Sequence, residues 1–146
     1  MENSNSSVEK AKKIKLDFKD SKYATGRRKR SIAKVWIKKG NGNIHVNGMK
    51  MNEYFKRPVH QIIVTRPLEI TQVSSNYDVK CSVKGGGLSG QAGAIILGIS
   101  KALIAHDENL KKNLKKDKLT TRDSRVVERK KYGHRKARRS FQFSKR

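Results

Sequence analysis

The clearest structural signal lies in residues 77–90, which read Tyr-Asp-Val-Lys-Cys-Ser-Val-Lys-Gly-Gly-Gly-Leu-Ser-Gly. Apolar and polar residues alternate from Tyr77 to Lys84, which predicts a strand with one face in the core and the other in water. Residues 90–106 carry apolar side chains around most of a helix, which we expect to pack on the sheet. Cys81 lies in the apolar row, so we interpret it as a small buried hydrophobe and not as a nucleophile.

A hairpin is predicted upstream of this strand. Residues 32–37, Ile-Ala-Lys-Val-Trp-Ile, are β-branched and aromatic, and residues 44–46 form a second short run of the same kind. The connection contains Gly40-Asn41-Gly42, and Asn-Gly favours the positive φ angles of tight hairpin turns. We therefore expect these two strands to pair with each other.

Helices should follow the hairpin and close the folded part. Residues 51–55 have apolar side chains at helical spacing, and a second helix should begin at Pro58 and end before Pro67, because proline removes a backbone donor. Residues 109–119 are rich in Lys with three leucines, which is typical of a surface helix. Strands with helices between them and one apolar helix predict a two-layer α/β (α+β) sandwich.

Composition divides the chain into three parts. Residues 23–119 hold 25 Leu, Ile, Val and Phe, whereas residues 1–22 and 120–146 hold 4 each. The ends bury too little apolar surface to offset chain entropy, so we expect a disordered or extended segment, a globular domain and an extended basic tail, in that order. The formal net charge of +24 divides over them as +2, +13 and +9, and this excess requires an anionic partner.

Several classes of protein are excluded by the composition. Cys81 is the only cysteine, so no intrachain disulfide can form. The four histidines are scattered, and none lies beside Cys81 at ligand spacing, so we expect no metal and no cofactor. The uncharged residues 85–100 are too short and too polar for a membrane span, and residues 1–22 lack the apolar run of a secretory signal.

The glycine loop, residues 85–90, satisfies the G-x-G-x-x-G pattern between a strand and a helix. A dinucleotide site also needs a parallel strand after that helix, but a Lys-rich helical pattern follows here. Gln91-Ala92 stands where a Walker loop would continue with Gly-Lys-Ser/Thr, so a nucleotide-binding enzyme is a minor alternative and we expect no catalytic residue. Two readings of the loop stay open: it binds nucleic-acid phosphate at a helix start, or it only makes a tight turn.

The last 27 residues hold eleven Lys or Arg, with Tyr132, Phe141 and Phe143 among them. Guanidinium groups pair with phosphates and aromatic rings stack on unpaired bases, so we favour RNA contact over a merely solvated charge run. At about 3.3 Å per residue such a tail could reach roughly 90 Å, which is far enough to thread between RNA segments.

A second cluster of cations, Arg27-Arg28-Lys29-Arg30, directly precedes the first predicted strand. Four consecutive cations repel one another without a counter-charge, so the cluster also suggests phosphate neutralisation. A nuclear-localisation signal is the competing interpretation of the cluster, and a DNA-compacting basic protein is an alternative for the whole chain.

Four separated motifs in this chain resemble the bacterial type of small-subunit ribosomal protein nine. They are residues 23–33, the Val46-Asn47-Gly48 turn, residues 85–95 and residues 121–146. The resemblance implies a four-stranded sheet with helices on one face and a left-handed βαβ crossover, which is an exception to the general rule of handedness. It also implies a non-enzymatic structural constituent of the small ribosomal subunit that binds ribosomal RNA in the head, contacts neighbouring head proteins, and is neither a membrane protein nor an obligate homo-oligomer.

The resemblance assigns RNA contacts to particular residues. At the extreme C-terminus, Ser144, Lys145 and Arg146 match the residues that reach the peptidyl-site (P-site) transfer RNA. The residues expected to contact ribosomal RNA lie in the cationic cluster, the glycine loop and the tail: Arg27, Arg28, Lys29, Arg30, Lys84, Gly86, Ser89, Gln91, Arg122, Arg125, Arg129, Lys130, Lys131, Tyr132, His134, Arg135, Lys136, Arg138 and Arg139.

The chain departs from the family at one point. The family usually shows an Arg-His pair after Gly-Ala-Ile, whereas this chain has Ile96-Leu97. An RNA contact carried by that pair is not expected to transfer, and the extra apolar face would suit a protein instead. The departure suggests either an organellar ribosome or a divergent bacterium, and so a location in the mitochondrial matrix or in the bacterial cytoplasm.

Overall fold

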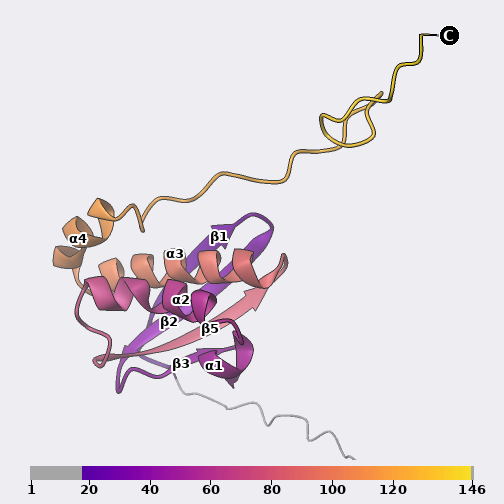
Figure 1. The fold of residues 1–146 in the computed structure, drawn as a ribbon. Coiled ribbons are helices and arrows are strands. Elements are labelled where there is room, and N and C mark those ends of the chain that lie inside the picture. Colours follow the sequence, from indigo (N-terminus) through magenta and orange to yellow (C-terminus); the bar gives the residue numbers. More distant parts are fainter. Residues whose placement is uncertain (1–17, 146) are drawn as a thin grey trace, which may run out of the picture.

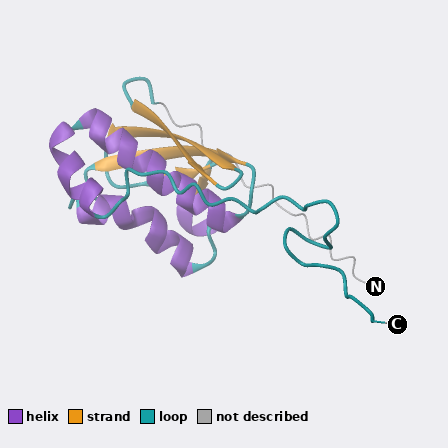
Figure 2. Cartoon of the chain, turned by 90° about the horizontal axis from the view of Figure 1, so that it is seen from above, coloured by secondary structure: helices purple, strands orange, loops and turns teal. Residues whose placement is uncertain are grey.

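A computed structural model describes residues 18–145 as one sheet with helices on one of its faces (Figures 1 and 2). The predicted α/β class is confirmed, but the sheet has five strands and not four. In chain order the elements are β1 (Lys22–Arg28), β2 (Ser31–Lys39), β3 (Ile44–Val46), β4 (Met49–Lys50), α1 (Met51–Tyr54), α2 (Pro58–Ile70), β5 (Tyr77–Lys84), α3 (Leu88–His106), the 3-10 helix η1 (Glu108–Leu110) and α4 (Lys111–Lys116).

Strand β5 is the centre of the sheet, and its alternating pattern is confirmed. The order is β1-β2-β5-β3-β4, with β5 antiparallel to β2 and parallel to β3. The side chains of Tyr77, Val79, Cys81 and Val83 are buried. Burial also raises the pKa of the Cys81 thiol far above its ordinary value, because the thiolate would lose its hydration. Cys81 is therefore the buried hydrophobe that its place in the strand predicts.

The predicted hairpin between β2 and β3 is wrong, because β5 lies between these two strands. The loop that joins them bends away along the start of β5. Asp78 accepts hydrogen bonds from the backbone amides of Asn41, at 3.0 Å, and Asn43, at 2.8 Å. Gly42 does have the expected positive φ of 87°. The predicted turn conformation at Gly42 is therefore present. The hydrogen bonds to Asp78, which lies 35 residues after Asn43, hold the loop against β5 and so prevent β2 and β3 from pairing.

The true hairpin partner of β2 is β1, a strand that the sequence pattern does not reveal. Residues Lys22 to Arg28 pair antiparallel with β2, from Lys22 opposite Ile37 to Arg28 opposite Ser31. The cationic cluster therefore forms the end of β1 and the β1–β2 turn, and does not precede the first strand. Gly26 is the only residue of β1 that is fully enclosed, which explains the lack of apolar alternation.

Helix α2 runs through Pro67 and ends at Ile70, so the predicted stop at Pro67 is wrong. Pro67 is buried together with its neighbours Val64 and Leu68. Burial of this face compensates for the missing backbone donor, which lies only one turn from the end of the helix. The predicted surface helix after residue 108 is present as η1 and α4, with Leu114 as its buried anchor.

Helix α3 crosses β1 and β2 at very short range. A Cβ atom on Gly26 would lie 1.9 Å from the carbonyl oxygen of Ala94, and one on Gly98 would lie 2.5 Å from the Val35 side chain. Only glycine permits this approach of strand and helix. By length and composition α3 could cross a membrane, but most of it is buried in the core of this fold.

The connection from β3 to the parallel strand β5 runs through α1 and α2. The family resemblance implies a crossover at this place, and the left-handedness of that crossover stays a prediction. After α4, residues 117–145 contain no helix or strand. The first of these residues lie along the body, and Figure 1 shows the rest of the tail running away from it. The predicted N-terminal extension lies mostly outside the described residues.

Candidate nucleic-acid interface

The β1–β2 turn presents the cationic cluster at one end of the sheet. Lys29 has a φ of 50° and makes the tight reversal between Arg28 and Ser31. Arg27, Lys29 and Arg30 are exposed, whereas Arg28 is partly covered. Three of the four predicted phosphate ligands are thus available to solvent, and the fourth is used inside the protein.

The glycine loop lies against the start of β2. Ser31 donates a hydrogen bond from its hydroxyl to the Gly85 carbonyl at 3.0 Å. A Cβ on Gly86 would lie 2.2 Å from that hydroxyl oxygen, and Gly85 and Gly86 both have positive φ angles, 76° and 63°. These two glycines are therefore required by the backbone and by Ser31. A Cβ on Gly87 would meet nothing, so Gly87 is not required for space.

Gln91 and Asn47 tie the loop to the rest of the body. The Gln91 side chain donates to the Gly85 carbonyl at 3.2 Å and accepts from the Tyr54 hydroxyl at 2.7 Å. The Asn47 side chain accepts a hydrogen bond from the Val83 amide at 2.8 Å and donates one to the Val83 carbonyl at 3.1 Å. Gln91, predicted to contact RNA, has both ends of its amide engaged within the protein.

A hollow of about 370 Å³ lies where the β1–β2 turn faces the glycine loop. We call it the turn-loop hollow. It brings together two parts of the predicted RNA contact set, although they lie far apart in the sequence. Two valines near the start of the tail also line it. Its lining residues are Lys29, Arg30, Gly86, Gly87, Val126 and Val127.

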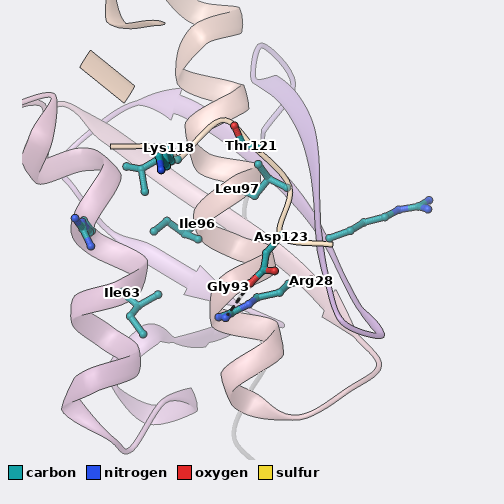
Figure 3. Close-up of a pocket in the computed structure, with 11 residues that line it drawn as sticks. Arg28, Ile63, Gly93, Ile96, Leu97, Lys118, Thr121 and Asp123 are labelled. Carbon is teal, nitrogen blue, oxygen red and sulfur yellow. Dashed lines mark ion pairs between the residues drawn. The ribbon is translucent and has the colours of Figure 1, made fainter. Parts of the chain in front are cut away.

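The root of the tail is held to the body by an ion pair. Arg28 passes over Gly93 on α3, where a Cβ would lie 2.2 Å from the Arg28 side chain, and its guanidinium lies 3.2 Å from the Asp123 carboxylate (Figure 3). Asp123 also accepts hydrogen bonds from the Arg125 guanidinium, at 2.8 Å for the shortest. These bonds hold the pKa of Asp123 well below its usual range, with Arg125 contributing most.

Further along, the tail folds back on itself. Glu128 forms ion pairs with Lys131 and Arg138, each at 2.8 Å. Both hydrogen bonds lower the pKa of Glu128, and the bond from Lys131 contributes most. Arg135 lies over the Phe141 ring, 5.4 Å from its centroid. Tyr132 and Phe143 are highly exposed, which is the arrangement that stacking on unpaired bases requires.

Ile96 and Leu97 lie at a second hollow, of about 220 Å³, between α2, α3 and the start of the tail (Figure 3). Ile63 and Leu119 add apolar lining. Leu97 is buried and Ile96 is partly exposed, so Ile96 supplies most of the apolar surface of this pair, and cations surround it. The cations of this tail-root hollow are Arg27, Arg28, Arg66 and Lys118.

The other predicted contacts are placed as follows. Lys84, just before the glycine loop, and Ser89, within it, are exposed, and His134 is half-buried in the folded part of the tail. Ser144 and Lys145 are exposed at the far end, and Arg146 lies outside the described residues. The remaining predicted tail residues are exposed: Arg122, Arg125, Arg129, Lys130, Lys131, Tyr132, Arg135, Lys136, Arg138 and Arg139.

Sequence reasoning missed Ser31, Asp123 and Glu128. The tail has only two carboxylates, and both pair with cations. That scarcity was the available signal, because an acidic residue in a strongly basic segment is surrounded by partners. Within residues 18–145 no group of three His, Cys, Asp or Glu side chains could hold a metal ion.

The chain matches a known protein family. A family described as ribosomal protein S9/S16 matches residues 26–146, which include the β1–β2 turn, the glycine loop and the whole tail. The match covers most of the chain, including every residue for which we predicted an RNA contact. The chain therefore belongs to the ribosomal protein S9/S16 family, and it is an RNA-binding structural constituent of the small ribosomal subunit that acts in translation.

Proposed function

We propose that the chain docks on ribosomal RNA of the subunit head through the turn-loop hollow and the tail root, and that its last residues reach the P-site transfer RNA. The observation that supports this most strongly is the turn-loop hollow itself. Lys29 and Arg30 line this hollow of about 370 Å³ together with Gly86, Gly87 and two valines of the tail. Cations opposite the start of a long helix suit a phosphate, which the helix dipole also favours.

The tail supports the second part of the proposal. It leaves the body beside this hollow, because Val126 and Val127 line the hollow and Asp123 is held by Arg28. An RNA strand docked on the turn and loop would therefore continue along the tail. From there the chain has some twenty residues left, a reach of at most roughly 70 Å, to bring Ser144, Lys145 and Arg146 to a transfer RNA.

The family is not known for enzymatic activity, and the fold gives the nucleotide-enzyme alternative little support. Helix α3 is followed by η1 and α4 within the described residues, and no strand there supplies the ribose-binding carboxylate. The Ser31 hydroxyl also fills the space next to Gly86.

Neighbouring head proteins are the partners we expect at the apolar floor of the tail-root hollow.

Docking is tested by binding the full chain to a head fragment of small-subunit ribosomal RNA over a range of salt. The double variant Lys29→Gln/Arg30→Gln should bind more weakly. The slope of the logarithm of the binding constant against the logarithm of the salt concentration should become less steep by about 2, one for each lost phosphate contact. Lys111→Gln/Lys112→Gln on α4 removes the same charge and should leave the slope nearly unchanged. Equal slopes for the two variants would argue against the turn-loop hollow, and stronger binding to duplex DNA at equal salt would favour the DNA-compacting alternative.

The transfer RNA contact is tested in reconstituted small subunits. Deletion of Ser144 to Arg146 should leave assembly intact and weaken P-site transfer RNA binding. Lys130→Gln/Lys131→Gln, which removes the same charge from the middle of the tail, should affect association with the subunit instead. Unchanged transfer RNA affinity after the deletion would refute the contact.

A further inference from the structure

The sheet has a second face, which the helices leave uncovered (Figure 2). Alternation along the strands places one set of side chains there, since their neighbours Val35, Val79 and Cys81 are buried on the opposite face of the sheet. The strand register aligns this set in cross-strand rows. The rows are Tyr23, Trp36 and Lys80; then Thr25, Lys34 and Ser82; then Arg27, Ile32 and Lys84.

The first row is aromatic. The rings of Tyr23 and Trp36 lie 5.3 Å apart at an angle of 41°, and 48% of the Tyr23 surface is exposed. The Lys80 ammonium lies 5.9 Å from the Trp36 ring centroid and 5.7 Å from that of Phe18. Tyr23 is exposed and Trp36 is partly exposed. Accessible aromatic rings beside a cation form the kind of platform on which unpaired bases stack.

The charge of this face is positive. Asp78 is the only carboxylate at the outward positions of β1, β2 and β5, and it already accepts two amides from the β2–β3 loop. A hollow of about 180 Å³, lined by Ile32, Lys34, Ser82 and Lys84, adjoins the aromatic row. The cations at the outward positions are Arg27, Lys34, Lys38, Lys80 and Lys84.

We infer that this open face is a second RNA-binding surface, which takes an unpaired base on Tyr23 and Trp36 and the adjoining phosphates on Lys34 and Lys84. The inference rests on the proposed RNA-binding function but uses neither the tail nor the turn-loop hollow. A single strand fits the chemistry better than a duplex, because paired bases offer no free ring faces to the aromatic row. An acidic protein would satisfy the cations but would leave the ring pair without a stacking partner.

Trp36 makes a direct test possible, because it is the only tryptophan in the chain. Its fluorescence is followed while the full chain is titrated with a short oligoadenylate, at raised salt so that contacts to the tail are weakened. We expect quenching by the single strand and little by the same strand annealed to oligouridylate. Tyr23→Leu should lower the affinity about five- to tenfold, at the modest end of what loss of one stacked base costs.

Ile62→Ala is the control, because it removes an exposed apolar side chain from α2, on the helical side of the sheet, and should leave the Trp36 response intact. Circular dichroism confirms that both variants are folded. RNA binding detected by anisotropy with unchanged Trp36 fluorescence would overturn the inference while leaving the proposed function standing. Equal quenching by polyglutamate would also overturn it, because it would show a surface that selects only for negative charge.

Discussion

The guanidinium of Arg28 lies 3.2 Å from the carboxylate of Asp123, and this contact joins the end of β1 to the root of the tail. The Arg28 side chain reaches Asp123 only because Gly93 leaves the surface of α3 bare at that point. One of the four clustered cations therefore directs the tail, while its three neighbours remain free to meet phosphate. The body thus sets the direction in which the tail leaves.

Asp123→Asn should release the root of the tail without unfolding the body. The carboxylate is exposed enough that we expect little change in global stability, but faster trypsin cleavage after Arg122 and Arg125. Asp117→Asn is the control, because the pair of Asp117 with Arg66 is longer, at 3.9 Å, and lies before the tail. Equal cleavage rates in the two variants would contradict a role of Arg28 in holding the tail.

The same ion pair should be insensitive to pH in the physiological range. Because the pKa of Asp123 is lowered in the folded chain, its contribution is fully present above the ordinary aspartate value of about 4 and is lost only as pH falls through the lowered value. The backbone amide of Arg125, which donates to Asp123 at 3.0 Å, is a direct probe. Its NMR shift should stay constant from neutral pH down to about pH 3, and a transition centred near the ordinary aspartate value of about 4 would disprove the lowered pKa.

Gly26→Ala should destabilise the protein by at least about 2 kcal/mol, because the added methyl would collide with the backbone of α3, which cannot rotate away. Gly87→Ala is the contrasting change, since its Cβ would meet nothing and its φ is −107°. That variant should lie within about 1 kcal/mol of the parent. Urea unfolding of both variants measures the difference, and a Gly26 variant as stable as the parent would be inconsistent with the close helix–strand contact.

The thiol of Cys81 should be inert in the native protein. It is 1% exposed, and burial raises its pKa, so almost no thiolate exists at pH 8. A chromogenic disulfide reagent should react with one thiol per chain after denaturation and with none before. Rapid reaction of the native chain would show that β5 opens far more readily than a central strand should.

The central strand and the main helix of this fold could be predicted from the sequence because the patterns that indicate them are local. Residues 77–84 alternate cleanly and residues 90–106 are apolar around most of a helix, so both elements were predicted within two residues of their observed bounds. The edges were not readable. β1 packs on α3 through Gly26, which contributes no apolar side chain to a periodic pattern, and its turn at Lys29 has neither Gly nor Asn.

Long-range contacts explain the other errors. Gly40-Asn41-Gly42 is a good hairpin signal, but Asp78 redirects the loop toward β5, and no local rule reveals a partner that distant. At the interface, composition identified the cations but not which of them are already paired. Arg28, Arg125, Lys131 and Arg138 are all held by tail carboxylates in the free chain.

The most direct test of the central claim is release of the chain from small ribosomal subunits by salt, measured by sedimentation. The parent chain should sediment with the subunits at moderate salt, as should Lys111→Gln/Lys112→Gln. Lys29→Gln/Arg30→Gln should be released at distinctly lower salt, because it loses two phosphate contacts at the turn-loop hollow. Release of both variants at the same salt concentration would contradict docking of the β1–β2 turn on ribosomal RNA.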